Sequence, residues 1–284
     1  MEFLAHKHLL DKGEIGLVCF SGSDASIAAD ARISYKKGTK QVSSDAQLIR
    51  YLVRHKHTSP LEQTLLKFYI KAPILVMRQW MRHRTWSYNE VSGRYSEIVD
   101  EAYVPMPEHV TTQDAKNKQA RTDVQVADSH GVCETMVLEQ DVLFDNYKKY
   151  LGQGVARETA RNNLPLSTYT EVVACTDLHN LLHFMQLRCS PHAQYEIRVY
   201  AEAIREMVKG LFPAVMQAWE DCVFGAVTLS RPMQDALAHY VDAVTRLGHS
   251  PQLASEEAVK SQAWASASEK ADCATFLQAI GAAR

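Results

Sequence analysis

Residues 78–95 carry the densest group of chemically active side chains in the chain. Arginines alternate here with a histidine, aromatic residues and small polar residues. Guanidinium groups pair with phosphate oxygens through two parallel hydrogen bonds, and they also stack on aromatic faces. The mixture predicts a pocket for an anionic ligand with a flat ring. Its members are Arg78, Trp80, Arg82, His83, Arg84, Trp86, Ser87, Tyr88, Asn89, Glu90, Ser92, Arg94 and Tyr95.

The same segment resembles the signature of the flavin-dependent thymidylate synthases, R-H-R-x-x-S-x-N-E-x-S. All seven fixed positions are met, by Arg82, His83, Arg84, Ser87, Asn89, Glu90 and Ser92. Residues 31–35, 57–62, 164–165 and 187–196 resemble further motifs of the family. The resemblance covers residues 1–223, with a gap near 110–135. A match of this length is far more specific than an isolated glycine loop.

The resemblance implies an enzyme that methylates dUMP reductively to dTMP in thymidylate synthesis. It implies methylenetetrahydrofolate as the carbon donor, with FAD as a hydride carrier that NADPH reduces again. It also implies a homotetramer whose active sites are shared between subunits. The family uses no cysteine nucleophile, and the six cysteines of this chain are scattered without a C-x-x-C pair. Such scattered cysteines predict reduced thiols and a cytoplasmic location.

The family's motifs assign ligand contacts to particular positions of this chain. The substrate-binding positions are Gln79, Arg82, Glu90, Ser92, Gly93, Arg94, Arg161 and Arg188. The FAD-binding positions are His57, Ser59, Arg82, His83, Arg84, Glu90, Asp177, His179 and His183.

Arg188 is the predicted catalytic residue, because the family places this arginine at the edge of the uracil. A fixed cation there favours ionisation at N3 and enriches C5 in electrons. Ser92 is expected to bind by hydrogen bonds, because its spacing reveals no base to activate it. Gly93 suits a close backbone approach, since it adds no side chain.

The helix predicted at residues 178–188 departs from the family, which commonly has N-x-R there, followed by Asn or His. The matching residues are Asp177, Leu178, His179 and His183. The missing arginine leaves the strength of FAD binding open. His179 and His183 share a helix face and imitate a zinc-protease helix, but Asn180 stands where that motif requires Glu. The H-x-H at residues 55–57 lacks further ligands at suitable spacing, so no metal site is predicted.

The expected fold is α/β (α+β), with a central, mostly antiparallel sheet flanked by helices. Hydrophobic patterns predict strands at residues 15–20, 64–72 and 169–175. They predict helices at residues 23–34, 136–151, 156–162, 178–188 and 193–212. Pro73 is expected to begin a helix that reaches about Arg84. The polar residues 108–134 predict an irregular, mobile loop or insertion.

The composition changes after residue 225, where alanine becomes dominant and no chemical motif is found. The expected organisation is a catalytic domain at 1–225 and a helical C-terminal extension of unknown role at 226–284. Pro232 is expected to begin one helix of the extension and Gly248 to end it. Ser266 and Glu269 have the spacing of a capping box for the last helix.

A net charge of −2 argues against a general polyanion-binding protein, so no nucleic-acid partner is expected. No apolar stretch long enough to cross a membrane exists, and no signal peptide is expected. Two alternatives remain open. One is an inactive homologue that keeps only the assembly. The other is a nucleotide- or RNA-binding module that uses the arginine–aromatic cluster, although Glu90, Glu97, Asp100 and Glu101 interrupt its basic stripe.

Overall fold

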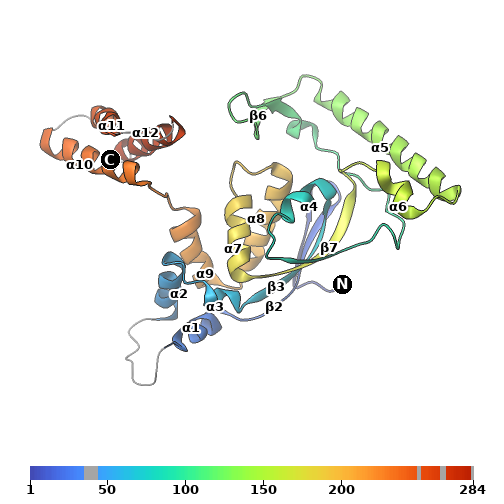
Figure 1. The fold of residues 1–284 in the computed structure, drawn as a ribbon, viewed down its shortest axis with the longest axis horizontal. Coiled ribbons are helices and arrows are strands. Elements are labelled where there is room, and N and C mark those ends of the chain that lie inside the picture. The colour runs from blue at the N-terminus through green and yellow to red at the C-terminus, as the bar shows by residue number, and fades with distance from the viewer. Residues whose placement is uncertain (35–43, 248–250, 263–266, 283–284) are drawn as a thin grey trace. The chain divides into compact units, whose positions relative to one another are not determined.

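The computed structural model describes residues 1–34, 44–247, 251–262 and 267–282. The chain divides into two compact units, Met1–Gly225 and Ala226–Arg284. Each unit has its own cluster of buried hydrophobic side chains. In the first unit, helices cover one face of a twisted sheet (Figure 1).

Among the described residues, the central sheet has five strands in the order β1-β2-β3-β7-β4, and every neighbouring pair is antiparallel. The predicted fold class is therefore confirmed. The predicted strands at 15–20, 64–72 and 169–175 correspond to β2, β3 and β7. The strands are β1 Ala5–Leu9, β2 Gly13–Phe20, β3 Leu65–Pro73, β4 Ser87–Glu90 and β7 Tyr169–Asp177.

Side chains alternate across β3, so the two faces of the sheet differ. Phe68 and Ile70 are buried on one face, while Lys67 and Lys71 lie on the other. Phe68 stands beside Ala174 of β7 in the antiparallel register. Because successive side chains point to opposite faces of a strand, this pattern leaves one apolar face for the helices to cover.

The helices of the first unit bury that face and extend the core beyond it. Helix α8 packs against β1 and β2, α7 packs against β7 and α8, and α2 packs against α9. The bounds are α1 Asp24–Arg32, α2 Asp45–Arg54, α3 Ser59–Glu62, α4 Ile74–Trp80, α5 Ser129–Gly152, α6 Arg157–Ala160, α7 Leu178–Arg188, α8 Tyr195–Lys209 and α9 Pro213–Trp219. Short 3₁₀ turns occupy Pro107–His109 and Arg161–Asn163, and a π turn occupies Glu220–Phe224.

Helix α4 ends at Trp80, so the prediction that it reaches about Arg84 is wrong. The next residues form a tight turn, in which the amide of His83 donates to the carbonyl of Trp80 at 2.9 Å. The Tyr88 hydroxyl donates to the carbonyls of Trp80 and His83, at 3.1 Å each. Trp86 is 5% exposed and packs on the same aromatic core as Trp80. Burying both indoles requires the chain to turn between them.

Residues 108–134 contain regular structure, so the prediction of an irregular loop is wrong. Strand β5, Thr111–Gln113, pairs antiparallel with β6, Arg121–Gln125. The Asp114 carboxylate accepts two backbone N–H bonds at 2.7 and 2.8 Å and closes the intervening turn. Asp128 caps α5, which begins at Ser129, before the predicted start at 136. Short polar side chains that bond nearby amides specify turns and caps as well as loops.

The second unit consists of helices in its described residues. They are α10 Arg231–Leu247, α11 Pro251–Lys260 and α12 Ala267–Ala282. Tyr240, Cys273 and Leu277 belong to its buried cluster. Gly248 and Ser266, the predicted helix end and helix cap, lie outside the described residues. No helix in the described part of the chain has both the length and the apolar character needed to cross a membrane.

Candidate active site

A buried histidine links the turn after α4 to the end of α7. His83 is 7% exposed, and its Nε2 accepts a hydrogen bond from Nε of Arg188 at 3.1 Å. The Nη2 group of Arg188 donates to the backbone carbonyl of Gln79 at 3.4 Å. Three predicted site residues therefore meet, one from the end of α4, one from the turn after it and one from the end of α7. The two protein bonds fix the plane of the Arg188 guanidinium.

The charge state of this pair follows from its burial. Desolvation, with the nearby positive charge of Arg188 and with His183, lowers the pKa of His83 to about 4. The imidazole is therefore neutral at neutral pH, and it carries its proton on Nδ1 because Nε2 is the acceptor. Burial also lowers the pKa of Arg188, although a guanidinium keeps its charge in proteins. The site thus holds one partly desolvated cation against a neutral acceptor.

The large aromatic residues of the signature segment belong to the core. Trp80 is fully buried and stacks on Phe184 with ring centroids 4.7 Å apart. Trp86 is 5% exposed and stacks on Phe68 at 6.3 Å. The prediction that these indoles belong to a ligand pocket is therefore wrong. Tyr95, in contrast, is 83% exposed.

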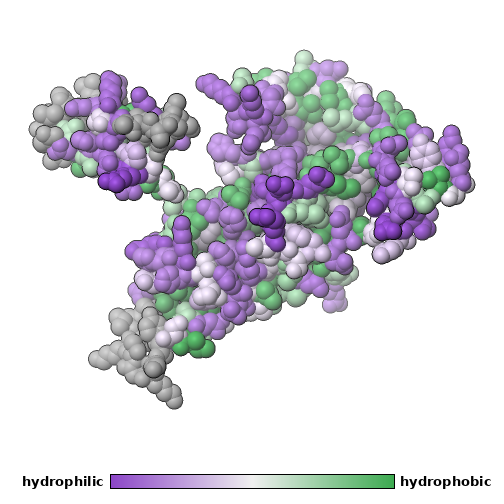
Figure 2. Space-filling view, viewed as in Figure 1, coloured by the Kyte–Doolittle hydropathy of each residue, from purple (hydrophilic) through white to green (hydrophobic). Residues whose placement is uncertain are grey.

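The other arginines of the segment are exposed. Arg78, Arg82 and Arg84 lie at the end of α4 and in the turn after it. Strongly hydrophilic residues gather over this region of the surface (Figure 2). Nε of Arg94 lies 3.0 Å from a carboxylate oxygen of Glu158, and both side chains are exposed. The predicted ligand roles of these arginines stay predictions.

A second group of predicted substrate residues lies where β4 ends. Glu90, Ser92, Gly93 and Arg161 line a cavity of about 120 Å³. A Cβ on Gly93 would lie 2.9 Å from Cδ1 of Ile98 and 3.0 Å from Nη1 of Arg161, so the glycine permits both side chains to approach closely. Glu90 Oε1 accepts a bond from the Thr170 hydroxyl at 2.7 Å, which holds its carboxylate at the cavity wall.

A third group, assigned to the flavin, lies beside His83, because the His183 ring meets the His83 ring edge to face at 6.0 Å. His57, His179 and His183 line a cavity of about 330 Å³ with apolar walls that include Leu182 and Trp219. The expectation that His179 and His183 share a helix face agrees with their position on one cavity. Ser59 and His57 also line a second cavity of about 550 Å³.

Asp177 has a role within the fold. Its carboxylate accepts bonds from the backbone N–H and the side-chain amide of Asn180, at 2.8 and 2.6 Å, and caps α7. Asp177 is a strong N-cap because its oxygens satisfy helix donors that have no other partner. The FAD contact assigned to Asp177 stays a prediction.

Tyr88, a member of the predicted cluster, holds the turn that presents His83. Thr170 of β7, which orients Glu90, carries no local signal in the sequence. Thr170 lies 80 residues from Glu90 in the sequence. Only the pairing of β4 with β7 brings them together.

The chain matches a family model described as "Thymidylate synthase complementing protein" over residues 17–214. A flavin-dependent thymidylate synthase of Gluconobacter oxydans is 47% identical over 229 residues, which cover 79% of this chain and 76% of the relative. One from Thermus thermophilus is 48% identical over 229 residues, covering 81% and 83%.

A solved structure has the same fold. It is the UMP/dUMP methylase PolB from Streptomyces cacaoi bound with 5-Br dUMP, with a TM-score of 0.68 and 32% identity. The similarity covers 75% of this chain and 96% of that one. With the length of the family match and the level of identity, these findings confirm the expected relationship. The chain belongs to the family of the flavin-dependent thymidylate synthases.

Proposed function

We propose that this chain converts dUMP into dTMP by reductive methylation, with methylenetetrahydrofolate, FAD and NADPH as its co-substrates and cofactors. Membership of the family supports the reaction, and a related methylase of the same fold was solved with dUMP and UMP analogues. The observation that carries the proposal is the Arg188 guanidinium, held by His83 and by the Gln79 carbonyl.

Arg188 activates the pyrimidine in this proposal. Its two protein bonds use two of the five N–H groups of a guanidinium, and they fix its orientation before a ligand arrives. Ionisation at N3 of a uracil creates negative charge, which a preorganised cation stabilises without further rearrangement. Partial burial strengthens the interaction, because a lower dielectric screens the charges less.

The cavity at the end of β4 binds another part of the nucleotide. Arg161 supplies a cation for the phosphate, and Gly93 is proposed as a backbone contact whose lack of a side chain leaves room for Arg161 beside it. Ser92 contributes a hydroxyl, which already accepts from the amide of Arg94 at 3.3 Å. Glu90 contributes a carboxylate oriented by Thr170. Gln79, Arg82 and Arg94 complete the proposed nucleotide contacts.

The residues present fit a flavin in their chemistry. The exposed guanidiniums of Arg82 and Arg84 suit a diphosphate, and the His57, His179 and His183 cavity joins imidazoles to an apolar wall. When bound, FAD supplies hydride transfer after reduction by NADPH. In this proposal the three histidines bind the cofactor and the apolar wall excludes water. Ser59, His83, Glu90 and Asp177 are the remaining proposed contacts.

A homotetramer with active sites shared between protomers is part of this proposal. Within the described residues of one chain, the cavity at the end of β4 and the histidine cavity have no lining residue in common. Exposed arginines on one protomer can complete a pocket on another, because a symmetric assembly repeats each surface. A cytoplasmic location belongs to the proposal, on the scattered spacing of the cysteines in the sequence.

Product formation tests the proposal directly. Purified protein is incubated with dUMP, methylenetetrahydrofolate, FAD and NADPH, and dTMP is measured by chromatography. Arg188→Ala is expected to cost on the order of 2–4 kcal/mol in transition-state stabilisation, by analogy with the loss of one preorganised donor. Arg231→Ala, an exposed arginine in the second unit, is the matched control.

Each outcome separates the alternatives. Production of dTMP that falls sharply in Arg188→Ala, but not in Arg231→Ala, supports the proposed function. Absence of dTMP and of any FAD spectral shift would indicate an inactive homologue. Tight binding of single-stranded RNA without dTMP formation would instead favour the nucleic-acid module.

A further inference from the structure

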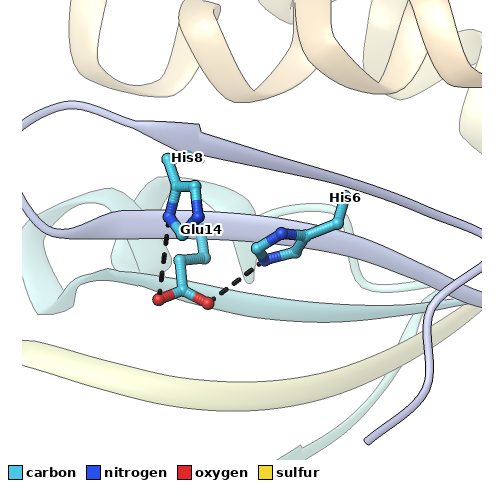
Figure 3. A group of neighbouring side chains, drawn as sticks. All are labelled: His6, His8 and Glu14. Carbon is cyan, nitrogen blue, oxygen red and sulfur yellow. Dashed lines mark hydrogen bonds and ion pairs between the residues drawn. The ribbon is translucent and has the colours of Figure 1, made fainter.

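A group of metal-ligating side chains lies on the outer hairpin of the sheet. His6 and His8 of β1 stand on the same face as Glu14 of β2, because His8 is the cross-strand partner of Glu14 and His6 lies two residues along. His6 Nε2 is 3.2 Å from one carboxylate oxygen of Glu14, and His8 Nδ1 is 3.9 Å from the other. Figure 3 shows the two imidazoles converging on this carboxylate.

The separations suit coordination by one ion. One ligand atom from each residue lies within 4.8 Å of the other two. Metal–ligand bonds of about 2.0–2.1 Å place neighbouring ligands of a tetrahedral ion roughly 3.3 Å apart. The contact between His6 and Glu14 already has that spacing, at 3.2 Å. Rotation of the exposed His8 side chain would bring its Nδ1, now 3.9 Å from the Glu14 carboxylate, to the same spacing.

The surroundings orient the site. The ring of Phe3 stacks on the His6 imidazole, with centroids 4.9 Å apart and planes within 5°. The His6 and His8 rings meet edge to face at 4.8 Å. Lys71 is the partner of Glu14 on β3, but its ammonium lies 2.8 Å from Glu101. Glu14 therefore pairs with the two imidazoles of His6 and His8.

The donor set selects a class of ion. Neutral imidazole nitrogens favour borderline transition metals, whereas Mg²⁺ and Ca²⁺ prefer oxygen ligands throughout. We propose that His6, His8 and Glu14 bind a divalent cation of the Zn²⁺ class, with water at the remaining coordination positions. Such an ion links β1, the edge strand, to β2. The site is separate from the residues assigned to dUMP and FAD.

Zinc titration of protein purified without a polyhistidine tag tests the site. The protein is stripped with a chelator, dialysed and titrated with Zn²⁺ against a chromogenic competitor. One Zn²⁺ per chain is expected. His8→Ala and Glu14→Gln should each weaken binding at least about ten-fold, since even outer-sphere substitutions cost 10–100-fold. His130→Ala, an exposed histidine in α5, is the matched control and should bind as the parent does.

The Glu14→Gln variant is expected to fold as the parent does, because the amide has the size of the carboxylate and also forms hydrogen bonds. Circular dichroism of each metal-free variant checks the fold. The proposal is overturned if the parent protein takes up no stoichiometric Zn²⁺. It is equally overturned if binding survives both His8→Ala and Glu14→Gln, because the ion then lies elsewhere.

Discussion

Replacing His83 by phenylalanine tests whether a buried, neutral imidazole holds Arg188 in its working position. The substitution keeps an aromatic ring beside Phe184, whose centroid lies 4.9 Å from that of His83. It removes the Nε2 acceptor that receives Nε of Arg188 at 3.1 Å, together with the Nδ1–H group. The guanidinium then keeps its bond to the Gln79 carbonyl and gains freedom to rotate.

The expected cost follows from the kind of bond that is lost. A hydrogen bond to a charged group contributes about 1.5–3 kcal/mol. If all of it is expressed in the transition state, kcat/KM falls by roughly 10- to 150-fold, because about 1.4 kcal/mol corresponds to a factor of ten. The loss should appear with dUMP as the varied substrate.

A rescue variant separates orientation from packing. His83→Gln places an amide oxygen near the former position of Nε2 and should recover part of the lost rate, whereas His83→Phe should not. Steady-state dTMP formation and dUMP binding are measured for both, with thermal denaturation as the control for folding. Activity of His83→Phe within threefold of the parent would refute the reasoning, as would equal impairment of the two variants.

The same substitution predicts a change in the pH dependence of stability. The folded pKa of His83 is about 4, below its ordinary value of 6.5. As pH falls from 6.5 to 4, the unfolded chain binds a proton that the folded chain refuses, so stability is lost across this window. No stability is lost in this way above pH 6.5, and the loss reaches its full size below pH 4. Urea denaturation should show a shallower loss for His83→Phe, and identical slopes would contradict the assignment.

Three further predictions concern other residues. Gly93→Ala places a Cβ 2.9 Å from Cδ1 of Ile98 and 3.0 Å from Nη1 of Arg161, so KM for dUMP should rise several-fold while the fold survives. An unchanged KM would contradict a role for Gly93 in the nucleotide site. Iodoacetamide at pH 8 should modify exposed Cys19 and spare Cys189, because burial raises the pKa of the Cys189 thiol to about 12. Mass spectrometry of the native protein measures the two modifications, and faster labelling of Cys189 would contradict the prediction. The Asp24 carboxylate accepts two backbone N–H bonds at the start of α9, at 2.7 and 3.3 Å. Asp24→Ala should therefore lower the free energy of unfolding by about 1–2 kcal/mol in urea denaturation. An unchanged free energy of unfolding would contradict the capping role.

Local features of the fold could be predicted from the sequence because they depend on neighbouring residues. The alternation of Lys67 and Lys71 with apolar residues predicts the strand that becomes β3. Ser23 and Ser44 precede apolar helical patterns, and each forms a capping box in the structure. The R-H-R-x-x-S-x-N-E-x-S signature predicts the family, which the comparisons confirm.

The end of α4 and the roles of its aromatic residues could not be predicted in this way. Trp80 and Trp86 resemble a ligand-stacking pair in the sequence, since aromatic residues serve cores and ring-binding pockets alike. Their burial depends on Phe184, which lies about a hundred residues away. The hydrophobic periodicity of a short segment does not indicate a contact with a residue so far away in the sequence.

The sequence by itself determined which residue types are available: the arginines, His83, Glu90 and Gly93, within the strands and helices that carry them. Only the tertiary structure decided which of them meet. Packing of α7 beside the turn after α4 places Arg188 on His83, 105 residues away, and burial then fixes the imidazole as neutral. Both effects depend on solvent exclusion by distant segments, a property that adjacent residues in a sequence do not carry.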